Sequence, residues 1–213
     1  MSINASKMPN SATLRRTPQQ NRGKESQSEI LDGARKILSQ DGFEKFSMRR
    51  ISAASSVGLR TIYDYFPSKT SVLHTLLEER LKLRLKIFDR TIAAIPADAK
   101  LGEFIESYLG SMRKEGFWSI YDIGLRNAAT HEESLKSLLQ WYEAETIDRY
   151  VQALRSAGSK WSGNDLRTTA SYLLSISAQF EPGVIVQEDK NSRKLTLELV
   201  QHTFSAILRK VLS

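Results

Sequence analysis

The fold of this chain is decided mainly by the stretch Arg60-Thr61-Ile62-Tyr63-Asp64-Tyr65-Phe66-Pro67-Ser68-Lys69. It predicts a short helix over residues 59–65 that carries basic, hydroxyl and phenolic side chains and ends before the proline. Residues 47–55 predict another short helix, and residues 56–58 a tight turn. Two short helices joined by a turn of about three residues form a helix-turn-helix, whose second helix enters the DNA major groove.

A longer pattern surrounds this motif. Its residues share a fixed order along the chain and are Gly42, Phe43, Ser47, Ile51, Thr61, Ile62, Tyr63, Tyr65, Phe66 and Lys69. The pattern resembles the tetracycline-repressor (TetR) family of bacterial transcription regulators over about residues 25–85. The turn departs from the family, because Ser56 stands at the usual Gly and Gly58 at the usual Ser. Gly58 removes a side-chain cap from the second helix, and Ser56 must adopt the backbone angles of the turn.

Composition limits the class of protein. The chain has 213 residues, of which 40% are hydrophobic and 26% charged, and no cysteine. This is a soluble globular composition without an apolar run of membrane-spanning length, so we expect a cytoplasmic protein with no membrane partner. Without cysteine there is no disulfide, thiolate zinc site or cysteine nucleophile. The three histidines are far apart and no catalytic motif is present, so we expect no enzyme, no metal and no cofactor.

The charge is distributed unevenly along the chain. Residues 1–95 carry a net charge of +8 and residues 96–213 a net charge of −1. A positive excess at one end is typical of a nucleic-acid-binding module. The N-terminal half is therefore the expected site of DNA binding.

The hydrophobic periodicity predicts an all-α protein in three parts. Residues 1–24 are polar and basic, and we expect a disordered tail. Residues 25–85 form the three-helix head, with the helix-turn-helix at about 46–65 and Phe43 and Phe46 in its core. A long helix over residues 69–95 joins the head to a helical effector-binding and dimerisation domain, residues 86–213.

Two groups of head residues are candidates for DNA contacts. Arg49, Arg60 and Thr61 suit base edges, because arginine donates two hydrogen bonds to guanine and threonine offers a methyl group and a hydroxyl. Leu59 adds an apolar base contact. The expected phosphate-binding residues are Ser47, Tyr63, Tyr65 and Lys69. The alternative is that the tyrosines are core residues and the arginine of the second helix a solvated charge.

The C-terminal part carries two further expectations. The family resemblance implies a ligand pocket among its helices, and the candidate residues are Phe104, Tyr108, Trp118, Tyr121, Trp141 and Phe180. Their alternative role is ordinary core packing. The last two helices, about 165–180 and 193–212, are apolar over more than one face, which predicts a homodimer interface of four helices. The alternative is burial in a larger monomeric core.

The resemblance implies a homodimeric repressor that a small-molecule effector releases from a palindromic operator in double-stranded DNA. One alternative is a DNA-binding regulator without an effector. Another is a helical small-molecule-binding protein or enzyme in which the head only aids folding. The uneven charge argues against the last alternative, because such a protein needs no basic N-terminal half.

Overall fold

The computed structural model describes residues 8, 21–94, 107–108, 110–112, 114–117, 119–179 and 190–212. The helices with assigned bounds are α1 (Asn21–Asp41), α2 (Met48–Ser55), α3 (Leu59–Tyr65), α4 (Lys69–Ala94), α6 (Ile120–His131), α7 (Glu133–Ser156), α8 (Gly163–Gln179) and α10 (Lys190–Leu212). None of the helices in the described ranges has both the length and the apolar character needed to cross a membrane. The all-α fold predicted from the sequence is confirmed.

The chain divides into two compact units. The first unit contains Met1–Lys82 and Trp118–Trp141, and the second contains Leu83–Phe117 and Tyr142–Ser213. The division falls within α4 and within α7, so each of these helices contributes to both units. Helix α6 lies in the same unit as the three helices of the head, although it is far from them in sequence.

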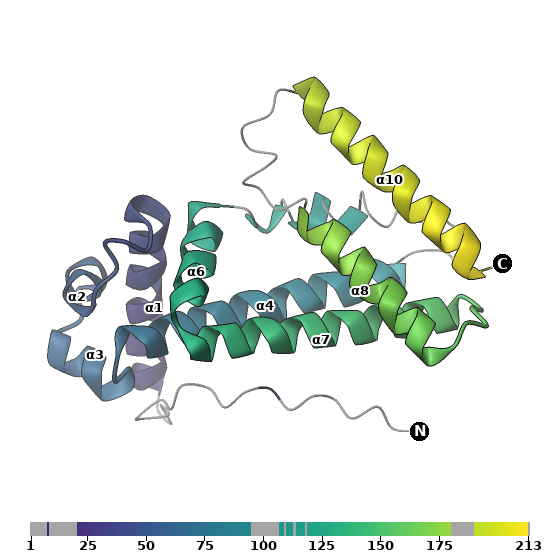
Figure 1. Cartoon of the computed structure of the whole chain (residues 1–213). Coiled ribbons are helices and arrows are strands. Elements are labelled where there is room, and N and C mark those ends of the chain that lie inside the picture. The colour runs from purple at the N-terminus through teal and green to yellow at the C-terminus, as the bar shows by residue number, and fades with distance from the viewer. Residues whose placement is uncertain are drawn as a thin grey trace. The chain divides into compact units, whose positions relative to one another are not determined.

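The helices of the head begin and end where the local sequence indicates. Ser47 caps α2 by accepting a hydrogen bond from the Arg50 amide. Helix α3 ends at Tyr65, and α4 starts after Ser68, whose hydroxyl accepts from the Ser71 amide at 3.2 Å. Figure 1 shows α1, α2 and α3 grouped around one another. The three-helix head is thus formed by residues that carry their own start and stop signals.

Helix α1 is the centre of the first unit and packs against both α2 and α6. At Gly33 the approach of α2 is so close that an added Cβ would lie 2.8 Å from the Ser55 Cβ. A second close approach occurs at Gly124 of α6, where an added Cβ would lie 3.2 Å from Leu38. The absence of a side chain at these two positions brings the helix backbones together.

An ion pair joins α4 to α6 inside the first unit. The Arg80 guanidinium donates to both carboxylate oxygens of Asp122, at 2.7 and 3.0 Å. The same carboxylate accepts from the amide and hydroxyl of Ser119, at 3.1 and 3.0 Å, and so caps the start of α6. A bidentate pair between largely buried groups fixes direction as well as distance. It therefore sets the position of α6 on α4.

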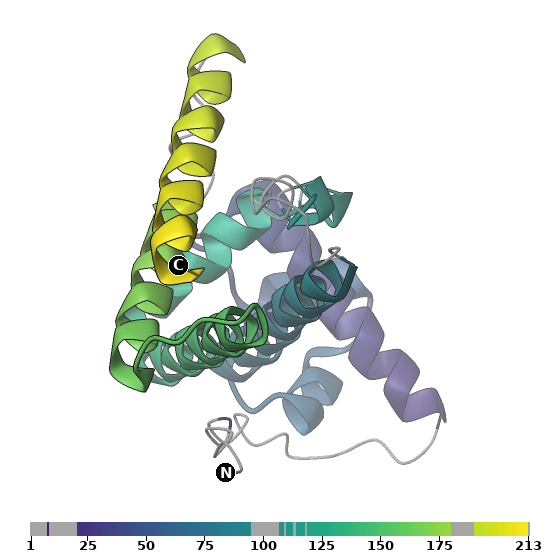
Figure 2. The same cartoon turned by 90° about the vertical axis from the view of Figure 1, so that its right-hand side faces the viewer.

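The second unit has a core formed by α4, α7, α8 and α10. One cluster contains Phe88, Tyr150, Ala170, Leu173 and Phe204, and another contains Leu154, Leu166 and Val211. Helix α10 lies against α8, as Figures 1 and 2 both show. The Ser159 hydroxyl donates to the Val211 carbonyl at 2.8 Å, which attaches the end of α10 to the turn before α8.

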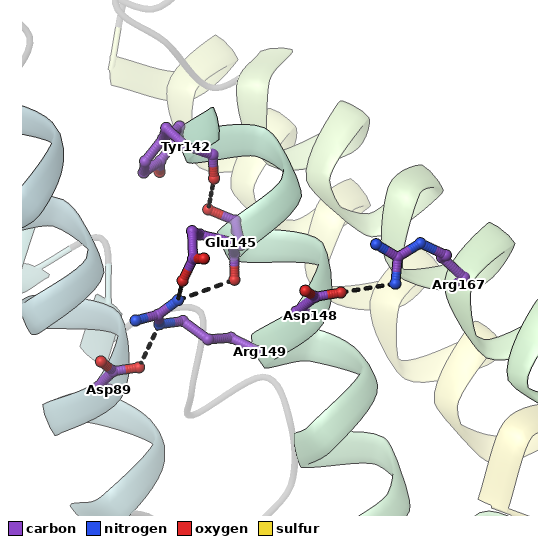
Figure 3. A network of polar contacts seen from close by, with 7 residues as sticks. Asp89, Tyr142, Glu145, Asp148, Arg149 and Arg167 are labelled. Atoms are coloured by element: carbon purple, nitrogen blue, oxygen red, sulfur yellow. Dashed lines mark hydrogen bonds and ion pairs between the residues drawn. The ribbon is translucent and has the colours of Figure 1, made fainter. Parts of the chain in front are cut away.

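Arginines also link the helices of the second unit (Figure 3). Arg149 of α7 donates to Asp89 of α4 at 2.8 Å and to Glu145 at 2.7 Å. Arg167 of α8 donates to Asp148 of α7 at 2.6 Å. Helix α7 is therefore held to its neighbour on each side by an arginine–carboxylate pair.

Some boundaries differ from those that the sequence predicts. Helix α1 begins at Asn21, so residues 21–24 belong to it rather than to the tail; Arg22 and Lys24 among them are good helix formers. Ser162 caps α8, since its hydroxyl accepts from the Asp165 amide at 3.2 Å. Phe46 is buried as expected, whereas Phe43 is only half-buried. Apart from residue 8, the remainder of the tail lies outside the described residues, as do residues 95–106.

We expect Gly33→Ala to destabilise the protein by about 1–3 kcal/mol, because the new methyl group meets the Ser55 backbone rather than a side chain that can move. The matched control is Gly110→Ala, since nothing lies within 4 Å of a Cβ added at this helical position. Gly110→Ala should stabilise by up to about 1 kcal/mol. Urea unfolding measures both variants, and equal stabilities would contradict the close approach.

Candidate functional site

The turn between α2 and α3 is held by its own serines. The Ser52 hydroxyl donates to the Val57 carbonyl at 2.7 Å, and the Val57 amide donates to the Ser55 hydroxyl at 3.3 Å. Ser56 adopts the left-handed conformation, with φ 59°, at a cost of roughly 1 kcal/mol. Gly58 precedes α3 without a side-chain cap. Ser56 therefore adopts the backbone conformation that the turn was expected to impose on it.

Acidic partners divide the cations of the head into two sets. Arg50 pairs with Asp41, and Arg35 pairs with Asp32 and Glu79, whose distances to it are 2.6 and 2.5 Å. By contrast, four exposed cations of the head have no carboxylate within 4 Å in the part of the chain that the structure describes, and these are Lys36, Arg49, Arg60 and Lys69. The last three are the cations that the sequence selects for DNA. Their charge is available to an external anion.

The other candidate DNA residues differ in exposure. Tyr63 is 40% exposed, but Tyr65 is 7% exposed and belongs to the core of the head. Leu59 and Thr61 are half-buried at the start of α3. The Ser47 hydroxyl already accepts the capping hydrogen bond of α2, and its proton remains a donor for a phosphate. The structure thus brings all of these residues except Tyr65 to an exposed or half-exposed position.

Tyr121 lies where α1, α4 and α6 meet in the first unit. Its hydroxyl donates to the Leu76 carbonyl at 3.5 Å, and the Arg80 guanidinium carbon lies 5.7 Å from its ring centroid. Burial raises the pKa of Tyr121 to about 12, against the opposing effect of Arg35 and Arg80. The phenol is therefore a neutral hydrogen-bond donor at physiological pH.

An aromatic cluster occupies the second unit. The ring of Phe88 makes edge contacts with Tyr108 and Tyr150, at centroid distances of 5.8 and 4.9 Å. Burial, with a further contribution from Tyr142, raises the pKa of Tyr108 well above its ordinary value. Nearby, the Arg84 guanidinium lies over the rings of Phe117 and Tyr142, at 5.6 and 5.3 Å. Polar and aromatic side chains are thus grouped together in the second unit.

Three of the six candidate ligand residues lie in the described part of the chain. Tyr108 belongs to the aromatic cluster of the second unit, whereas Tyr121 and Trp141 belong to the first unit. The remaining three, Phe104, Trp118 and Phe180, lie outside the described residues. Tyr121 contacts helix α4 and is close to the charged groups of Arg35 and Arg80.

Several residues of these sites carry no signal in the sequence. Asp41 selects which of two adjacent arginines is paired, and Arg84 lies over rings from two other segments. Phe88 connects two tyrosines that are 42 residues apart in the chain. All of these contacts join residues distant in sequence, which periodicity and short motifs do not report.

The comparisons with known proteins agree with this geometry. Residues 30–76, which include α2 and α3, match the model of the family described as bacterial regulatory proteins, tetR family. The HTH-type transcriptional regulator EthR of Mycolicibacterium smegmatis is 30% identical over 92 residues, a match that covers 41% of this chain and 42% of the relative. This chain thus matches less than half the length of that relative.

Solved structures extend the similarity to the whole fold. A TetR-family transcriptional regulator of Streptomyces coelicolor is similar with a TM-score of 0.68 and 16% identity, over 89% of this chain and 97% of that chain. The flavonoid-responsive regulator FrrA is similar with a TM-score of 0.60 and 20% identity, over 88% and 97%. At these identities the similarity establishes the fold.

One buried ionisable group of the first unit affects stability. His74 of α4 is 1% exposed, and its Nδ1 lies 3.7 Å from Glu78 Oε2. Neither ring nitrogen makes a hydrogen bond among the described residues. Burial lowers the pKa of His74, and Glu78 opposes this shift only partly. The folded protein therefore keeps this ring neutral at pH values where the unfolded chain already binds a proton.

The free energy of unfolding should consequently fall as the pH decreases below about 6.5, by up to about 1.4 kcal/mol per pH unit from this residue. Above that pH, His74 should make no contribution to the pH dependence of the free energy of unfolding. We expect His74→Gln to reduce this dependence, as measured by urea unfolding between pH 7.5 and 5.5. The control is His202→Gln, an exposed position. An equal pH dependence in wild type and His74→Gln would contradict the assignment.

Proposed function

We propose that the chain is a member of the TetR family of bacterial regulatory proteins, whose model matches residues 30–76, and that it is a homodimeric transcriptional regulator that binds a palindromic operator. A small-molecule effector in the second unit releases it. The observation that carries the DNA-binding part is that Arg49, Arg60 and Lys69, in the first turns of α2, α3 and α4, are exposed and without a carboxylate partner in the described part of the head.

The division between paired and unpaired cations supports a DNA-binding face. An arginine held by a carboxylate must break that pair before it binds a phosphate or a base, whereas an unpaired one loses only solvent. Arg49 is the second residue of α2 and Arg60 the second residue of α3, and these helix ends are the parts of a helix-turn-helix that approach DNA. Arg50, adjacent to Arg49, is held by Asp41 and serves the fold of the head.

Base reading and phosphate binding are assigned to different residues. Arg49, Arg60, Thr61 and Leu59 are proposed to read bases in the major groove. Ser47, Tyr63 and Lys69 are proposed to hold phosphates and so to set the register of the head on the duplex. Tyr65 is left out of this set because its side chain is buried in the head.

Exposed apolar residues on the last two helices support a homodimer. Tyr172 of α8 is 55% exposed and Leu199 of α10 is 59% exposed. Ser175, one turn from Tyr172, is also exposed and permits a close approach of another helix. We propose that these faces of α8 and α10 pack against the same faces of a second copy. Two heads then read the two halves of a palindrome.

The aromatic cluster of the second unit supports an effector. Phe88, Tyr108, Tyr142 and Tyr150 provide aromatic walls and phenolic hydrogen-bond donors, which suit a flat organic molecule. The similar regulator FrrA is described as flavonoid-responsive, and we propose the same general mode of response here. A typical coupling of about 1–3 kcal/mol would change operator affinity roughly 5- to 150-fold.

A regulator without an effector is the second candidate. The contacts of Phe88 with Tyr108 and Tyr150 are the edge-to-face contacts of a packed core. In that case the concentration of the protein or a protein partner would control operator binding. Addition of small molecules would then leave DNA affinity unchanged.

The DNA-binding face is tested by selecting bound sequences from a random DNA pool and titrating the selected duplex. We expect Arg49→Ala and Arg60→Ala each to weaken binding to it by about 5- to 150-fold, the value of one bidentate base contact. Arg50→Ala is the matched control for Arg49→Ala. It should change DNA affinity less than about twofold, and it should reduce stability by at most about 1 kcal/mol, since it loses an exposed ion pair.

Equal losses of affinity in Arg49→Ala and Arg50→Ala would contradict the role of Asp41 in separating the two arginines. Uniformly weak binding that depends on salt alone would show that the head does not read bases.

The dimer is tested with Leu199→Arg. Each of the two copies would lose about 1.5–3 kcal/mol of apolar burial, so the dissociation constant of the dimer should rise by about 100-fold or more. Light scattering over a range of protein concentrations measures it. Ile123→Arg, at an exposed position of α6, is the control and should leave the oligomeric state unchanged. A Leu199→Arg protein that stays dimeric would exclude this interface.

A further inference from the structure

The ring of Phe43 connects two helices of the first unit. Phe43 lies in the segment between α1 and α2. The Lys69 ammonium, on the first residue of α4, lies over its ring, 5.4 Å from the centroid. The ring of His131, the last residue of α6, is stacked on the same side chain with a centroid distance of 6.2 Å and an interplanar angle of 10°. Three segments distant in sequence thus meet at one aromatic ring.

The position of Lys69 is unusual in two respects. A cation at the first residue of a helix opposes the helix dipole, so stability alone does not favour lysine there. Its side chain is exposed, and no carboxylate in the described part of the chain pairs with it. A lysine stem is flexible, and no such ion pair fixes the position of the ammonium. The Phe43 ring is the contact that restrains the ammonium.

Phe43 contributes little to the core. It is half-buried, whereas Phe46, three residues later, is buried. His131 is exposed and packs on the ring without any role in the core. Neither residue is therefore required mainly for the stability of the head.

We propose that Phe43 and His131 are positioning residues for DNA binding, and that they hold the Lys69 ammonium where it meets an operator phosphate. This inference rests on the proposed function, in which Lys69 is a phosphate contact. Restraining the side chain before binding lowers the conformational entropy lost on binding. Because His131 ends α6, the position of α6 also affects this phosphate contact.

The test is a double-mutant cycle on the duplex selected from the random pool. Lys69→Met should reduce the slope of log affinity against log salt by about 0.9, the value of one phosphate contact. Phe43→Leu should weaken binding by about two- to fivefold, the value of an exposed cation–π contact, and should reduce the same slope. In the Lys69→Met background, Phe43→Leu should have no further effect. The single variant Phe43→Tyr keeps an aromatic ring and should bind DNA as wild type does.

A second variant avoids dependence on the folding of Phe43→Leu. His131→Ala changes an exposed residue and should shift affinity and salt slope in the same direction, and His131→Phe should restore both. Thermal unfolding of each variant serves as the folding control. A merely structural role would lower stability without changing the salt slope.

Each other outcome overturns the inference and identifies the step that failed. Additive effects of Phe43→Leu and Lys69→Met, or an unchanged slope in His131→Ala, would mean that the ring does not act through Lys69. An unchanged slope in Lys69→Met, with a selected duplex still bound, would remove Lys69 from the phosphate contacts and leave DNA binding in place. A pool from which no duplex is selected would remove the proposed function itself.

Discussion

The close approach of α1 to α2 at Gly33 is the contact on which the rest of the first unit depends. Ser55, the residue that meets Gly33, ends α2 and also accepts a hydrogen bond from the turn at Val57. The position of the turn, and therefore of α3, follows from how near α2 lies to α1. The second close approach, at Gly124, fixes α6 to the same helix at Leu38, five residues after Gly33.

Charge in the head is organised by its acids as much as by its bases. Asp41 holds Arg50, and Glu79 holds Arg35, so each of these arginines serves the fold. Between α4 and α6 the pair of Arg80 and Asp122 has the same role. Of the exposed cations that remain unpaired in the described part of the head, Lys36 lies within α1, and Arg49, Arg60 and Lys69 lie in the first turns of α2, α3 and α4. Net charge alone does not reveal this division, because it counts paired and unpaired groups equally.

Much of the fold could be predicted from short-range signals. The proline after α3, the serine before α2 and the apolar periodicity of α4 define those helices within a residue or so. The attachment of α6 to the head could not be predicted, because it depends on Gly124 and on an ion pair between residues 42 positions apart. For the same reason the sequence does not predict that the Tyr121 hydroxyl contacts the Leu76 carbonyl of α4.

The composition of the first unit has a consequence for exchanging parts between related regulators. Residues 21–82 and 118–141 belong to one compact unit although 35 residues separate them in the chain. A chimaera joined once, after α4, would keep Leu38 of α1 and Arg80 of α4 but would receive α6 from the other parent. The native partners of these two residues, Gly124 and Asp122, would then be replaced. Recombination would preserve the head only where both segments are inherited from the same parent. The unit of inheritance is therefore discontinuous in the gene, even though the helix-turn-helix itself is continuous.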